Sequence, residues 1–246
     1  KSALVPFLAG IPLRIGFRGE ARYGLLNRRH RLDEAQLPLM AERYAQLAEP
    51  IGAPPHRPLA RTSLRVDPAY RENALVAHDL DTERPIVVMC PGAEYGPAKR
   101  WPARHFATLA AHFAGRGRQV WLMGATKDRA IATEIAALVP GAVQRRAVKN
   151  LAGHTDLAAA IDLMSLAELV VTNDSGLMHV AAALGRRVVA LYGSSSPDHT
   201  PPTTPDAVIA RIAIECSPCY ARECPLGHFR CMNDLTPEIV LTAIGR

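Results

Sequence analysis

The chain has 246 residues, 48% of them hydrophobic, which is enough to bury the core of one large domain or two small ones. Its net charge of +6 suits acidic partners, but the basic residues lack interleaved aromatic side chains, so no nucleic acid is expected as a partner. Neither an apolar run of 18 residues nor a basic-then-apolar leader occurs in it, so neither a membrane span nor a signal peptide is expected within these residues, and the composition is typical of a cytoplasmic protein.

Residues 1–83 have the least regular pattern. They open on KSALVPFLAGIPLRIGF, without an initiating Met, and such a stretch is expected in the middle of a domain, so we expect an N-terminal portion to precede it. The segment 32–52 predicts one helix, and the Pro-rich GAPPHRP (52–58) predicts a connector. We interpret residues 1–83 as the remainder of one domain followed by a linker.

Residues 84–235 alternate apolar runs with helical patterns, which predicts an α/β fold: a Rossmann-like domain with a parallel sheet and crossover helices. Between the apolar runs 85–90 and 119–123, a helix with one apolar face is predicted from the spacing of Phe106, Leu109, Ala110 and Phe113. The stretch 194–235 is rich in loops, and residues 236–246 predict a C-terminal helix. The predicted strands are 85–90, 119–123, 168–172 and 187–192.

The turn after the first predicted strand is PGAEYGPAKRWP (91–102). In open α/β sheets, ligands bind at the carboxyl ends of the strands. Glycines such as Gly92 let backbone approach a ligand, and Lys99 supplies a mobile positive charge that suits a diphosphate. The alternative is a plain connector with a surface lysine. Neither a Walker A loop nor the G-x-G-x-x-G dinucleotide motif is present.

Two further turns carry polar residues. In MGATKDRA (123–130), Asp128 either caps the next helix, the more common arrangement, or accepts hydrogen bonds from ribose hydroxyls. In TNDSGLMHVAAALG (172–185), Asp174 and Ser175 precede a helix whose free amides favour an anion, and His179 lies on the same side as Ser175. The alternative here is an ordinary capped helix with a partly buried histidine.

A cysteine-rich segment follows these turns. Its spacing, C-x2-C-x4-C-x6-C, is not a familiar zinc pattern, so reduced thiols, a disulfide and a structural zinc site all remain open, and no metal is predicted. The segment contains Cys216, Cys219, Cys224 and Cys231, with His228 among them.

The segments CPGAEYGPAKRWP, VTNDSGLMHVAAALGRRVVALYGSSSPDHTPP and KSALVPFLAGIPLRIGFRGEARYGLLN together resemble the lipopolysaccharide heptosyltransferases of glycosyltransferase family 9. The resemblance implies a GT-B fold of two Rossmann-like domains, with the lipopolysaccharide inner-core acceptor on residues 1–83 and ADP-heptose on residues 84–235. It implies an inverting transfer of L-glycero-D-manno-heptose without metal or cofactor. It also implies a cytoplasmic enzyme that can contact the inner membrane peripherally.

The resemblance also implies which residues bind the donor. Lys99 is expected at the phosphates, Asp128 near the ribose, and the stretch 155–157 near the adenine. The expected catalytic aspartate lies upstream of Lys1, so we expect this chain alone to bind the donor without transferring heptose. The expected donor-binding residues are Gly92, Ala93, Lys99, Asp128, Thr155, Leu157, Asp174, Ser175, Gly176 and His179.

Three other functions are considered. A non-enzymatic module that binds nucleotide sugars fits the same turns, and so does a related family 9 heptosyltransferase with a different acceptor. A nicotinamide-dependent dehydrogenase is disfavoured because the glycine-rich dinucleotide motif is absent.

Overall fold

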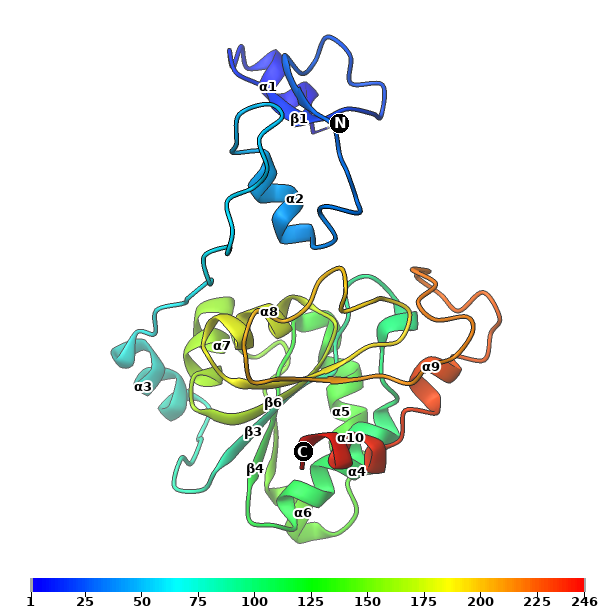
Figure 1. Ribbon diagram of the computed structural model, residues 1–246. Helices are drawn as coiled ribbons and strands as arrows, with labels where there is room; N and C mark the ends of the chain where they lie inside the picture. The colour runs from blue at the N-terminus through cyan, green and yellow to red at the C-terminus, as the bar shows by residue number, and fades with distance from the viewer. Residues whose placement is uncertain (1, 246) are drawn as a thin grey trace. The chain divides into compact units, whose positions relative to one another are not determined.

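The computed structural model describes residues 2–245, which form two compact units (Figure 1). The first unit comprises the chain up to Arg61 together with Asp198–Pro201, and the second comprises Thr62–Pro197 and the chain from Pro202 onward. The two units therefore divide after Arg61, whereas the sequence analysis ended the first domain and its linker at residue 83. The reason is that helix α3 (Pro68–Ala77) packs against α7 (Leu157–Met164) of the second unit.

The first unit contains two short parallel strands, β1 (Ile15–Phe17) and β2 (Arg28–His30), in which Phe17 lies opposite His30. It also contains the helices α1 (Leu4–Leu8) and α2 (Met40–Gln46). The predicted helix over 32–52 is thus shorter than expected. Pro38 lacks an amide and disfavours a helical conformation in the residue before it, so the helix begins only after this proline.

The second unit is built on six parallel strands in the order β5-β4-β3-β6-β7-β8. All four predicted strands are present, while the edge strands β5 and β8 were not predicted because they are short and largely half-buried. The strands are β3 (Ile86–Cys90), β4 (Gln119–Leu122), β5 (Val148–Asn150), β6 (Ala167–Asn173), β7 (Arg187–Leu191) and β8 (Ala207–Ala210).

Helices cover both faces of this sheet (Figure 1). Along β3, Val87 and Met89 pack in the core cluster with α4, α5 and α10, whereas Val88 and Cys90 pack in the cluster with α3, α7 and α8. A strand buried on both faces requires a continuous apolar run, which is what the sequence contains. The helices not yet given are α4 (Ala103–Ala114), α5 (Arg129–Leu138), α6 (Ala142–Arg146), α8 (Gly176–Ala183), α9 (Arg230–Asn233) and α10 (Pro237–Ile244).

The predicted apolar face of α4 is confirmed, since its four predicted residues are all buried, and the predicted C-terminal helix corresponds to α10. The chain runs from β3 to β4 and β5 on one side, then crosses back to β6 on the other side of β3. Turns diverge at such a switch point and leave a crevice at the carboxyl ends of the strands. Among the described residues, no helix is both long enough and apolar enough to cross a membrane.

Candidate functional site

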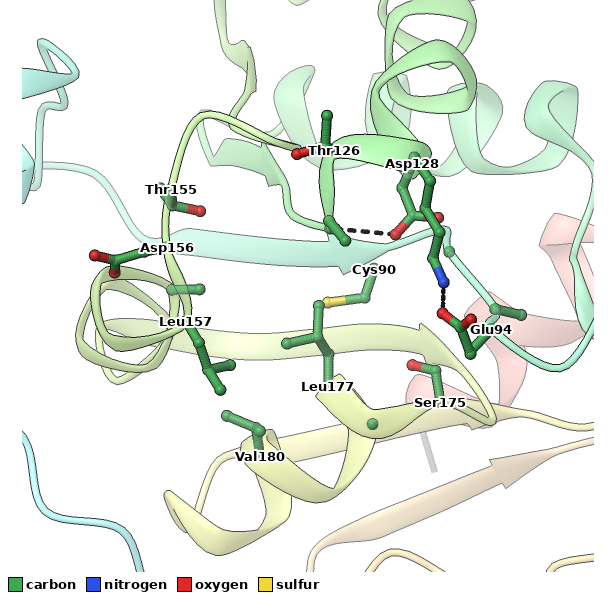
Figure 2. A pocket seen from close by; sticks show the side chains of 17 residues that line it. Cys90, Glu94, Thr126, Asp128, Thr155, Asp156, Leu157, Ser175, Leu177 and Val180 are labelled. Carbon is green, nitrogen blue, oxygen red and sulfur yellow. Dashed lines mark hydrogen bonds and ion pairs between the residues drawn. The ribbon is translucent and has the colours of Figure 1, made fainter.

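A cavity of about 560 Å³ lies at the carboxyl ends of β3, β4 and β6 (Figure 2). Its volume is in the range usual for small-molecule sites, and its position is the switch point of the sheet. Four segments line it: the end of β3 with its turn, the turn after β4, and the first turns of α7 and α8. The lining residues are Cys90, Gly92, Ala93, Glu94, Gly124, Ala125, Thr126, Lys127, Asp128, Thr155, Asp156, Leu157, Ala160, Ser175, Gly176, Leu177 and Val180.

The cavity has an apolar end and a polar end. Figure 2 shows Leu157, Leu177 and Val180 toward one side, together with the polar Thr155 and Asp156 before Leu157, and Glu94 and Ser175 toward the other. An ion pair joins the Lys127 ammonium to the Glu94 carboxylate at the polar end. Both side chains are substantially exposed, so water screens this pair and it contributes little to stability. The Lys127 ammonium can therefore exchange Glu94 for the anion of a ligand.

Asp128 is buried between the turns that follow β3 and β4. Its Oδ2 accepts a hydrogen bond from the Ala125 amide at 3.0 Å, and its Oδ1 is buried without a partner among the described residues. Asp128 stands at the N-cap position of α5, but its side chain makes no capping hydrogen bond there. Its bond from the Ala125 amide instead caps the short 3-10 helix η2 (Thr126–Asp128) that leads into α5, so a capping role is present at this turn, and the contact with ribose stays a prediction.

Gly92 is required by the position of Asp128, because a methyl group at residue 92 would clash with the Asp128 carboxylate. Gly92→Ala is expected to lower the free energy of unfolding by about 1–3 kcal/mol, the usual cost of overpacking. The measurement is urea denaturation. The control is Gly176→Ala, since no heavy atom lies within 4 Å of a Cβ placed there. Equal losses in the two variants would contradict this account.

The start of α8 lacks a side-chain cap. Ser175 occupies the N-cap position in an extended conformation, but its hydroxyl makes no capping hydrogen bond and lies 3.3 Å from Thr172 Oγ1. Ser175, Gly176 and Leu177 all line the cavity. The ordinary capped helix is therefore not what forms here, and the N-terminal dipole end of α8 meets the polar end of the cavity, where it favours an anion.

A second polar cluster is centred on Asp174, the residue before Ser175. Its Oδ2 lies 2.5 Å from the Lys99 ammonium and accepts a hydrogen bond from Ser195 Oγ at 2.6 Å. His179 is close enough to be influenced by both charges: burial lowers its pKa most, Asp174 raises it and Lys99 lowers it further. Lys99 is therefore neutralised by a carboxylate, whereas the sequence interpretation took its charge as free.

The structure thus divides the expected donor-binding residues into two adjoining groups. One group lines the cavity: Gly92, Ala93, Asp128, Thr155, Leu157, Ser175 and Gly176. The other group, Lys99, Asp174 and His179, forms the polar cluster and is absent from the described cavity lining. Asp174 and Ser175 are consecutive, so the two groups meet at the start of α8.

Sequence reasoning missed Lys127, although it lies in the turn after β4, and the rule that ligands bind at strand ends would have found it. It also missed the apolar wall formed by Cys90, Ala160, Leu177 and Val180. Apolar residues of these types also fill the hydrophobic core, so the sequence does not distinguish a residue that lines the cavity from one that packs in the core.

Asn173, the last residue of β6, joins two of the turns. Its Nδ2 donates to the Pro91 carbonyl at 2.7 Å, and its Oδ1 accepts from the Trp101 amide at 3.1 Å. Asn173 and Trp101 are both buried. The asparagine of the NDSG sequence therefore holds both ends of the 91–102 turn against β6.

The cysteine-rich segment surrounds a separate cavity of about 290 Å³, lined by Cys216, Cys219, Cys224, Cys231 and His228. The four cysteines are free, and burial raises the pKa of the Cys231 thiol, with the other three thiols adding to the effect. Among the described residues, no group of three or more His, Cys, Asp or Glu side chains is arranged to hold a metal ion.

A parallel sheet covered on both faces, with a two-ended cavity at its switch point against a helix N-terminus, is typical of a nucleotide-binding domain. The model of glycosyltransferase family 9 (heptosyltransferase) matches residues 1–230, and the chain belongs to this family. The resemblance inferred from the three sequence segments is confirmed.

The relatives agree with this assignment. The chain is 45% identical to lipopolysaccharide heptosyltransferase 2 of Escherichia coli over 250 residues, covering all of this chain and 72% of the relative. It is 42% identical to lipooligosaccharide heptosyltransferase 2 of Haemophilus influenzae, covering 72% of that protein. The chain also matches the solved structure of E. coli ADP-heptose lps heptosyltransferase II, with 44% identity and a TM-score of 0.88. The match covers 99% of this chain and 72% of the chain in that structure. The predicted GT-B fold class and the predicted class of enzyme, a heptosyltransferase, are confirmed.

Proposed function

We propose that the chain binds ADP-heptose in the cavity of the second unit and serves the transfer of L-glycero-D-manno-heptose to the inner core of lipopolysaccharide. The observation that carries this proposal is the two-ended cavity, with an apolar wall at one end and a lysine beside a helix N-terminus at the other. The names of the relatives supply the sugar and the acceptor. The first unit is proposed to bind the acceptor.

The two ends of the cavity suggest one orientation of the donor. An adenine ring fits the apolar end beside Leu157 and Val180, where burial of its faces is favourable. The diphosphate then reaches the start of α8 at Ser175, and Lys127 exchanges Glu94 for a phosphate oxygen. The heptose extends toward the cluster around Asp174.

This orientation also supports the chemistry of the transfer. As the bond to the departing ADP breaks, negative charge grows on the phosphate, and fixed amide dipoles and lysine ammonium groups stabilise it. Lys127 and the α8 terminus supply such groups without a metal ion. Attack by an acceptor hydroxyl from the opposite face inverts the sugar carbon and needs a general base. We further propose that this occurs in the cytoplasm, in peripheral contact with the inner membrane, to whose anionic surface the net charge of +6 is suited.

The expected result is that ADP binds at least about tenfold more tightly than UDP, a difference of about 1.4 kcal/mol, in calorimetric titration. Lys127→Ala should weaken ADP binding by about 1.5–3 kcal/mol, the range of hydrogen bonds to charged groups, and leave adenosine binding unchanged. Lys149→Ala is the matched control, because Lys149 is on β5 and pairs with Asp79 away from the cavity lining. Equal affinity for ADP and UDP, or binding of neither, would overturn the proposal.

A further inference from the structure

The cysteines lie in a long connection between β8 and α9. Residues 211–229 contain neither a helix nor a strand (Figure 1), and a connection of this length without secondary structure is uncommon unless it has a functional role. Within this described range, Ile212 and Ile214 are the residues that pack against the hydrophobic core. The remaining residues, 215–229, are here called the cysteine segment, and all of them are half-buried or exposed. Hydrogen bonds to neighbouring turns are therefore the main contacts that hold the cysteine segment in place.

The cysteine segment is bonded to the turn that contains Lys99. Tyr95 Oη donates to the Tyr220 carbonyl at 2.6 Å, and the Ala98 amide donates to the Arg222 carbonyl at 3.0 Å. The ring of Tyr95 also lies near the Lys99 ammonium, which is 5.1 Å from the ring centre, a distance at which a cation is attracted to an aromatic face. The conformation of this turn, and with it the position of Lys99, therefore depends on the cysteine segment.

The cysteine segment is also bonded to the turn that follows β7. Ser217 Oγ donates to the Gly193 carbonyl at 2.7 Å, and the Tyr220 amide donates to the Ser194 carbonyl at 2.6 Å. Ser195 is the next residue of this turn. The cysteine segment thus holds two turns that are far apart in the sequence, one that contains Lys99 and one that contains Ser195.

These two turns meet at Asp174. The Lys99 ammonium lies 2.5 Å from Asp174 Oδ2, and Ser195 Oγ donates to the same oxygen at 2.6 Å. The Asp174 side chain is only 6% exposed, so its charge depends on these two partners more than on water. The cavity lined by the four cysteines lies at the same junction, because Ala98 and Ser194 line it as well.

We propose that the cysteine segment is a positioning element of the donor site, and that Tyr95 and Ser217 are its positioning residues. Through them the segment fixes Lys99 and Ser195 around the Asp174 carboxylate. Polar groups that are fixed before a ligand arrives lose less freedom when it binds, so the affinity for the ligand rises. The effect on the sugar rests on the proposed function, in which the heptose extends toward Asp174, whereas the positioning rests on the hydrogen bonds alone.

The first test measures the positioning of Lys99 without any ligand. Tyr95→Phe keeps the ring and removes the hydroxyl that donates to the Tyr220 carbonyl. Acetylation by acetic anhydride, followed by mass spectrometry, should be faster at Lys99 in this variant, while Lys149 on β5 reacts at the parent rate. Tyr44→Phe is the matched control, because Tyr44 is an exposed tyrosine of α2 in the first unit, and it should change neither rate. Equal acetylation of Lys99 in the parent chain and in Tyr95→Phe would overturn the proposal.

The second test measures the effect on the sugar by calorimetric titration with ADP-heptose and with ADP, which lacks the heptose. Tyr95→Phe and Ser217→Ala should each weaken ADP-heptose binding about threefold, the lower end of the effect of one hydrogen bond, because neither side chain is buried. ADP binding should stay unchanged in both variants. An equal loss for the two ligands would indicate a general loosening of the domain and would overturn the positioning role.

The two tests separate this inference from the proposed function. If neither ligand bound to the parent chain, the proposed function would fail, and faster acetylation of Lys99 in Tyr95→Phe would leave the positioning by the cysteine segment standing. If both ligands bound to the parent chain and neither affinity changed in Tyr95→Phe or Ser217→Ala, the cysteine segment would have no role in the donor site. That result would overturn the inference and leave the proposed function standing.

Discussion

Lys99→Met is expected to lower the free energy of unfolding by about 3 kcal/mol, because it leaves the Asp174 carboxylate buried without its cation. The side chain of Asp174 is only 6% exposed, and Ser195 Oγ still donates a hydrogen bond to it in the variant. Methionine keeps most of the aliphatic length of lysine, so the loss reports the charge more than the packing. Urea denaturation of the variant and the parent chain measures it.

The control for this prediction is a double-mutant cycle. Asp174→Asn removes the negative charge and keeps the shape of the side chain, so the double variant Lys99→Met, Asp174→Asn contains no unpaired charge at this position. The double variant is expected to recover more than half of the loss, since residues in direct contact are coupled. If the two single losses add up in the double variant, the ion pair does not account for the effect.

This pairing also marks the limit of what the sequence predicted about the site. The turns after the strands were found because the strand runs could be recognised and ligands gather at strand ends, which correctly directed attention to Gly92, Asp128 and Ser175. Lys99 and Asp174 are 75 positions apart in the sequence, so the residues around either one do not predict that they form an ion pair. Asp128 fits a cap by residue type, and its carboxylate does accept from the Ala125 amide at the start of η2, but its close packing against Gly92 and Gly124 is a long-range feature that the local sequence does not show.

The fold was predicted where the periodicity is strong. The central strands are buried on both faces, so each appears in the sequence as a continuous apolar run. Helix α4 is buried on one face, so its apolar residues recur at helical spacing. The edge strands β5 and β8 have only partial burial, so they carry a weak apolar signal. The unit boundary depends on the packing of α3 against α7, a long-range contact that composition does not encode.

The second large effect is expected at Asn173, the residue that joins the 91–102 turn to β6. Asn173→Ala removes three side-chain hydrogen bonds, one of them a longer bond to the Gly92 carbonyl at 3.4 Å, and leaves the Trp101 amide and the Pro91 carbonyl buried without these partners. Each buried group left unsatisfied costs about 1–3 kcal/mol, so a loss of about 2–4 kcal/mol in the free energy of unfolding is expected. The Trp101 amide should also lose protection in hydrogen exchange, because its acceptor is gone.

The matched control is Asn233→Ala. Asn233 is a half-buried asparagine whose Nδ2 donates to the His228 carbonyl at 2.8 Å, so its removal opens a backbone acceptor that water can reach. We expect a loss of about 1 kcal/mol or less there, with the exchange of the Trp101 amide unchanged. Because Gly92 and Ala93 line the cavity within the turn that Asn173 fixes, ADP affinity should fall in Asn173→Ala and persist in Asn233→Ala. An Asn173→Ala chain that keeps full stability and a protected Trp101 amide would show that the turn is held by other contacts, and the asparagine would then need a different role at the end of β6.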